Sequence, residues 1–87
     1  MEILFLNTAI KKGFSKETIF DKIISLENEF FPKYPYSLED IKNAHEQSRG
    51  NSLILIEKNE LIGYLMPILF KNKDYIQILT VAIDRDY

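Results

Sequence analysis

Cysteine and tryptophan are absent from these 87 residues, and histidine occurs once, at His45. Without cysteine the chain can form no disulfide, no thiolate nucleophile and no zinc site with sulfur ligands. A single histidine also argues against a transition-metal site built by this chain, so we expect no metal. No apolar run approaches the roughly 20 residues that a membrane-spanning helix requires. These absences exclude the disulfide-stabilised, zinc-thiolate and membrane-spanning classes of protein.

An excess of either charge sign is also missing, since 11 basic residues face 13 acidic ones and give a formal net charge of -2. Nucleic-acid-binding domains normally carry a basic patch or stripe, so we expect no nucleic-acid partner. The apolar N-terminal segment 1–6 has neither a basic region nor a small-residue cleavage site. We therefore expect no signal peptide, no membrane partner and a cytoplasmic location. The composition, 46% hydrophobic and 28% charged, is typical of one globular domain, here residues 1–87.

Apolar residues at spacings of three and four predict a helix over residues 16–31. Ser15 is placed to cap its N-terminus, and the proline at position 32 disfavours helical geometry in the residue before it. We expect the charged residues Lys22, Glu27 and Glu29 to lie mostly outside the apolar face of this helix. That face is expected to pack in the core.

A second helix is predicted to begin after Ser37, because Ser37 and Asp40 have the spacing of a capping box. Leu38, Ile41 and His45 share one side of this helix, which we expect to face the core. The segment 49–51 ends the helix, with the glycine at position 50 suited to a left-handed C-terminal cap.

Strands are predicted where β-forming residues lie between turn signals, over residues 2–7, 52–57, 61–70 and 75–84. Lys58 and Asn59 suit a two-residue hairpin turn, and residues 71–74 suit the next turn. Pro67 removes a ladder hydrogen bond, so we expect a bulge or irregular stretch there. The order strand, helix, helix and then a three-stranded antiparallel meander predicts an α+β fold with the meander packed on the helices.

Two segments resemble the GNAT superfamily of N-acetyltransferases. Residues 53–64 are similar to the second and third strands of that family, in which a charged turn is followed by an apolar pair, a glycine and an aromatic residue. Residues 79–87, Leu-Thr-Val-Ala-Ile-Asp-Arg-Asp-Tyr, are similar to the family's fourth strand and its exit, with Arg85 in place of the common proline. Together with the order of the elements, this resemblance implies the N-terminal half of a GNAT fold.

The resemblance implies acetyl-CoA as the cofactor and an amine, of unknown identity, as the acceptor. In the family, the exit of the fourth strand leads into a glycine-rich turn whose N–H groups hold the pyrophosphate. Gly13, Gly50 and Gly63 are isolated in this sequence and form no such turn. We therefore expect the N-terminal portion of an N-acetyltransferase that is inactive alone. The alternative is a non-enzymatic, truncated acyltransferase half that acts as an interaction module.

The interaction-module alternative predicts self-association, because the predicted last strand has no further strand beside it. Its open apolar edge, which runs from Tyr75 to Asp84, invites pairing with another chain. We expect a homodimer with twofold symmetry through this edge.

The resemblance also implies positions for the ligands. Cofactor contacts through main-chain groups fall at Val81 and Ile83. The connection between the two predicted helices borders the acceptor in the family, so its aromatic residues either line an acceptor pocket or pack in the core. The substrate-binding candidates are Phe31, Tyr34, Tyr36 and Gln77.

No catalytic residue can be assigned from the sequence. Gln77 stands where histone-acetylating relatives carry a glutamate base, and a glutamine side chain cannot take up a proton. His45 is a candidate base, but we interpret it as a half-buried structural residue of the second helix. The triplet Asp84, Arg85 and Asp86 is interpreted as a polar strand exit rather than as a metal or phosphate site.

Overall fold

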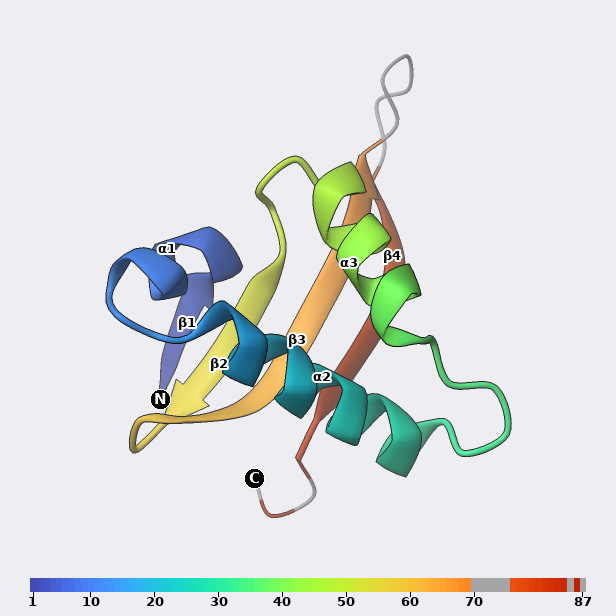
Figure 1. Cartoon of the computed structure of the whole chain (residues 1–87), viewed down its shortest axis with the longest axis horizontal. Coiled ribbons are helices and arrows are strands. Elements are labelled where there is room, and N and C mark those ends of the chain that lie inside the picture. The colour runs from blue at the N-terminus through green and yellow to red at the C-terminus, as the bar shows by residue number, and fades with distance from the viewer. Residues whose placement is uncertain (70–75, 85, 87) are drawn as a thin grey trace.

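The computed structural model describes residues 1–69, 76–84 and 86, with the backbone alone for 68, 69 and 76–79. Figure 1 shows the described elements along the chain. They are β1 (Glu2–Phe5), α1 (Leu6–Lys11), α2 (Lys16–Phe30), α3 (Leu38–Gln47), β2 (Leu53–Glu57), β3 (Glu60–Leu69) and β4 (Ile76–Ile83). The predicted turn at 71–74 and the starting residue Tyr75 of the predicted last strand lie outside the described residues.

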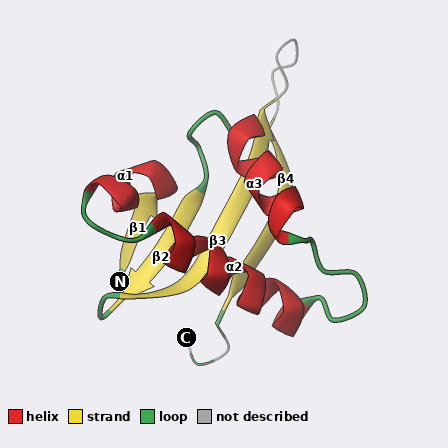
Figure 2. Cartoon of the chain, viewed as in Figure 1, coloured by secondary structure: helices red, strands yellow, loops and turns green. Residues whose placement is uncertain are grey.

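The strands form one antiparallel sheet in the order β1-β2-β3-β4, so the first strand joins the meander and makes it four-stranded. Figure 2 shows α2 and α3 lying across one face of this sheet, where both contact β3. The side chains between helices and sheet form one apolar core. Its fully buried large members are Leu6, Ile23, Leu26, Ile41, Ile54, Tyr64 and Met66. The α+β class predicted from the sequence is confirmed.

Both predicted N-terminal caps are confirmed. Ser15 accepts a hydrogen bond from the N–H of Thr18 at 3.3 Å. Ser37 accepts from the N–H of Asp40 at 3.1 Å, and the Asp40 carboxylate accepts from the N–H of Ser37 at 3.2 Å. This is a complete capping box, which fixes where α3 begins.

The sequence prediction missed α1 and extended the first strand too far. The strand ends at Phe5, and Leu6 turns into the helix, where its N–H donates to the carbonyl of Ser52 at 2.8 Å. Gly13, at φ +109°, ends α1 in a Schellman motif, in which the N–H of Phe14 reaches the carbonyl of Ala9 at 3.1 Å. A six-residue helix is too short to be stable by itself. It depends on burial of Leu6 and Ala9, which local sequence does not reveal.

The hairpin turn and the irregular stretch that were predicted in the meander are both present. Lys58 and Asn59 have φ of 51° and 63°, as a two-residue type I′ hairpin turn requires. The register between β3 and β4 shifts between Met66 and Pro67, where the proline was expected to disturb the ladder. The extra residue lies on β4, because Met66 pairs with Thr80 while Pro67 pairs with Ile78.

Candidate functional site

The outer edge of β4 carries main-chain groups that no described residue pairs. The N–H of Asp84 donates to the carbonyl of Ile62 on β3 at 2.6 Å. Hydrogen-bonded and non-hydrogen-bonded pairs alternate along an antiparallel ladder, so the main-chain groups of Ala82 also face β3. The N–H and C=O groups of Val81 and Ile83 therefore point away from β3. Since β4 is the last strand of the described sheet, these groups are free to meet a ligand or another strand.

The side chains of Val81 and Ile83 lie on the face of the sheet opposite the helices, where they are 46% and 45% exposed. Residues paired across neighbouring strands project from the same face. The register therefore places two apolar rows on that face, here called the open sheet face. One row is Phe5, Leu53, Leu65 and Val81, and the other is Ile3, Leu55, Gly63 and Ile83. The sheet is thus apolar on both faces.

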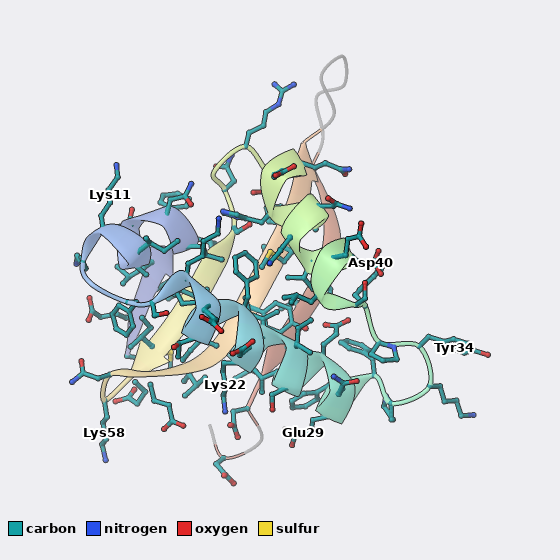
Figure 3. The ribbon with its side chains drawn as sticks, in the orientation of Figure 1. Lys11, Lys22, Glu29, Tyr34, Asp40 and Lys58 are labelled. Atoms are coloured by element: carbon teal, nitrogen blue, oxygen red, sulfur yellow. The ribbon has the colours of Figure 1, made fainter. Side chains whose placement is uncertain are left out.

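The predicted acceptor-binding residues Phe31, Tyr34 and Tyr36 lie on the side of the sheet opposite to the side chains of Val81 and Ile83. Phe31, Tyr34 and Tyr36 lie in segment 31–37, which joins α2 to α3 on the helix side of the sheet. Tyr34 is 89% exposed and points into solvent, as Figure 3 shows. Phe31 and Tyr36 are also exposed, at 40% and 36%. Gln77 pairs with Ile68 in the sheet, and its side chain lies outside the described residues.

A cluster of buried polar side chains joins this segment to the sheet. Glu27 on α2 is 1% exposed. Its Oε2 accepts hydrogen bonds from the hydroxyl of Tyr64 and, at 3.0 Å, from the hydroxyl of Thr80. Its Oε1 accepts from the N–H of Tyr36 at 3.2 Å. Burial, followed by the hydrogen bond to Glu27, raises the pKa of Tyr64 above its ordinary value, so this phenol remains a donor.

The expectation that Glu27 lies outside the apolar face of its helix was wrong. Glu27 follows Phe20 by seven residues and Ile23 by four, and both of those are buried on the core side of α2. Helical geometry places such residues on one face. The spacing alone could have identified Glu27 as buried. Its charge argued otherwise, because a carboxylate is rarely buried without partners, and those partners come from β3, β4 and segment 31–37.

A groove with a volume of about 530 Å³ lies between the first half of α2 and α3. Leu38, expected to face the core, lines this groove instead and is 39% exposed. The groove is lined by Lys16, Glu17, Phe20, Asp21, Leu38, Lys42, His45 and Glu46. Lysines and carboxylates are mixed around it, so it offers no field of one sign to attract a charged ligand such as a CoA thioester.

His45, in the last turn of α3, takes part in a hydrogen-bond network. Its Nδ1 lies 2.9 Å from the hydroxyl of Ser52, and its Nε2 lies 3.0 Å from Oδ1 of Asn7. Serine, histidine and asparagine joined in this way have the connectivity of a nucleophilic triad. Ser52, however, is 0% exposed, so no substrate can reach its hydroxyl. The network is therefore structural, and it ties α3 to α1 and to the residue before β2.

The pH dependence of stability tests this structural role. Burial lowers the pKa of His45, the charge of Lys16 lowers it further, and Glu46 opposes the shift. The folded state thus prefers the neutral ring. The contribution of His45 to the free energy of unfolding is complete above the ordinary pKa of 6.5, and it is lost as the pH falls through the lower pKa of the folded state. We expect unfolding free energy to fall between pH 7.5 and 5.5, by at most about 1.4 kcal/mol per pH unit.

His45→Gln keeps hydrogen-bonding groups but does not titrate. Urea unfolding of this variant is expected to give a flatter pH profile than the unsubstituted protein over the same range. Identical slopes in the two proteins would show that His45 does not contribute.

Comparisons with protein-family models, curated proteins and solved structures find no match to this chain. Among the described residues, no group of three or more His, Asp or Glu side chains is placed to hold a metal ion. Within the same part of the chain, no helix has the length and apolarity needed to cross a membrane. The candidate functional site therefore consists of the edge of β4, the open sheet face and the Glu27 cluster.

Proposed function

We propose that these 87 residues form the N-terminal part of a GNAT-type N-acetyltransferase, in which β4 binds the thioester arm of acetyl-CoA and a primary amine is the acceptor. The order of the elements and the similarity of residues 53–64 and 79–87 to the strands of that family support the proposal. The single observation that carries it is the outward direction of the main-chain groups of Val81 and Ile83 on the last described strand.

These groups suit the chemistry of the pantetheine arm. The arm is extended and contains amides, so it can pair with an open strand edge as an added strand would. A free backbone N–H can also donate to the thioester carbonyl and stabilise negative charge that develops there when an amine attacks. The bulge on β4, just before Thr80, locally interrupts pairing with β3 and bends the strand. Bulges of this kind are common beside active sites.

The open sheet face further supports a larger assembly. An antiparallel sheet with one solvated face normally alternates apolar and polar residues, whereas this sheet is apolar on both faces. Covering the second face requires other polypeptide. Gly13, Gly50 and Gly63 are isolated, so they do not form the glycine-rich turn that would hold the pyrophosphate, and Gln77 cannot serve as the general base.

Titration of the uniformly ¹⁵N-labelled chain with acetyl-CoA and with S-acetylpantetheine tests the proposal. We expect the amide resonances of Val81 and Ile83 to shift with either ligand, with millimolar or weaker affinity and no acetyl transfer. Val81→Pro removes one outward N–H while leaving the bonds to β3, so it is expected to weaken these shifts. Shifts confined to the groove between α2 and α3, or none, would contradict the proposal. Micromolar affinity would contradict the conclusion that Gly13, Gly50 and Gly63 form no pyrophosphate-binding turn.

Self-association is the second candidate function, and the same edge favours it. An unpaired strand with half-exposed Val81 and Ile83 can pair with β4 of a second copy and extend the sheet across a twofold axis. We expect sedimentation velocity to show dimers as the concentration rises toward the millimolar range. Ile83→Lys places a charge at this edge and should keep the chain monomeric. A monomer at every concentration would exclude this candidate.

A further inference from the structure

The carboxylate of Glu27 links the two parts of the chain that carry the predicted ligand contacts. One part is β4, where Thr80 immediately precedes Val81, a candidate for cofactor binding. The other part is the aromatic segment 31–37, in which Tyr36 is a candidate for binding the amine acceptor. Thr80 donates its hydroxyl to Oε2 of Glu27, and Tyr36 donates its N–H to Oε1. Both contacts therefore fall on one rigid, planar group.

We infer that Glu27 is a positioning residue of the proposed transfer site, in which its carboxylate fixes the aromatic segment 31–37 relative to β4. This inference rests on the proposed function, in which β4 is the cofactor side and segment 31–37 is the acceptor side. Glu27 touches neither substrate nor cofactor in this role, because it is 1% exposed and its carboxylate oxygens accept from Tyr36, Tyr64 and Thr80.

The donors of this cluster come from parts of the chain that are far apart. Tyr36, Tyr64 and Thr80 lie 9, 37 and 53 residues from Glu27 in the sequence. None of the ion pairs found among the described residues involves Glu27. Among the residues that the structure describes, three dipoles satisfy the carboxylate, and each must be aimed at it. Replacing all members of such a cluster by well-packed apolar groups is often neutral for stability, whereas removing one member leaves the others without partners. We therefore expect the cluster to specify one arrangement of the elements that it joins.

A carboxylate is required for this arrangement because it accepts on both oxygens. Methionine fills a similar volume and accepts from neither side, while glutamine offers one acceptor oxygen to three donors. Among the described residues, the N–H of Tyr36 has no acceptor other than Oε1 of Glu27. When Oε1 is removed, the exposed segment that Tyr36 anchors loses this hydrogen bond to the protein core.

Amide hydrogen exchange at Tyr36 provides the first test. The slowest amides of β2 and β3 report the loss of global stability in Glu27→Met. Beyond that loss, we expect the exchange rate of the Tyr36 amide to rise by a further factor of about ten to a hundred. Tyr64→Phe perturbs the same buried cluster but keeps Oε1, so it is the matched control. In that variant, the Tyr36 amide should change only as much as the slowest amides do. Equal behaviour of Tyr36 in the two variants would overturn the inference.

The pair Thr80→Ser and Thr80→Val provides the second test, which remains decisive if Glu27→Met does not fold. Serine keeps the hydroxyl donor, and valine has nearly the shape of threonine without it. When S-acetylpantetheine is added, we expect the Tyr36 amide resonance to move in the unsubstituted protein and in Thr80→Ser. In Thr80→Val it should stay in place while Val81 and Ile83 still respond.

The outcomes separate the two proposals. A response at Val81 and Ile83 without one at Tyr36 in the unsubstituted protein would overturn the role of Glu27 and leave the proposed function standing. No response at Val81 and Ile83 would refute the proposed function and, with it, the role of Glu27 in a transfer site. If the Tyr36 amide still exchanged selectively faster in Glu27→Met, Glu27 would be a structural anchor only.

Discussion

Replacing Glu27 with alanine is expected to lower the free energy of unfolding by about 3–5 kcal/mol, the largest effect predicted for a single side chain here. The substitution leaves the hydroxyls of Tyr64 and Thr80 and the N–H of Tyr36 without their acceptor inside the protein. It also leaves a cavity between α2 and the sheet. Because small domains are stable by only about 5–15 kcal/mol, this loss is a large fraction of the total stability.

Urea denaturation followed by circular dichroism measures this effect. Ser25→Ala, at an exposed position of the same helix, is the matched control and should change stability by no more than about 0.5 kcal/mol. A loss below about 1 kcal/mol for Glu27→Ala would mean that water replaces the carboxylate at little cost, in contradiction to the burial of this cluster.

Replacing Gly63 with alanine is expected to cost about 1–3 kcal/mol, although the substitution adds a single methyl group. A Cβ atom at this position would lie 2.9 Å from the carbonyl oxygen of Ala82 and 3.2 Å from Cγ1 of Ile83. The first of these is a backbone atom of β4, so the ladder between β3 and β4 must shift to make room. The same shift would move the outward main-chain groups of Val81 and Ile83.

A double-mutant cycle separates the two contacts. Ile83→Ala removes Cγ1 but leaves the carbonyl of Ala82 in place. If the backbone contact dominates, Gly63→Ala should cost nearly the same in the Ile83→Ala background as in the unsubstituted protein. Full recovery in the double variant would show that only the side chain of Ile83 is in the way. The Gly63→Ala protein should also lose the thioester-induced shifts at Val81 if the proposed binding edge depends on this register.

Local chemistry in the sequence determined most of the described elements. Ser15 and Ser37 cap the helices that were predicted after them, and Lys58 and Asn59 form the predicted turn. The bulge expected near Pro67 is also present. In the caps and the turn the interacting groups lie within a few residues of one another, and at Pro67 the missing N–H is a property of the residue itself, so spacing and side-chain type were sufficient. The helix α1 was missed because its stability depends on burial and on the distant carbonyl of Ser52.

The sequence by itself determined the α+β class, the antiparallel meander and the alternation that places Val81 and Ile83 on one face of their strand. Only the tertiary structure decided which main-chain groups on β4 face outward, because that depends on the pairing of Asp84 with Ile62. It also decided that Glu27 is buried rather than exposed. A charged residue can be buried only if donors are brought to it, and here those donors are assembled by packing across 53 residues of sequence.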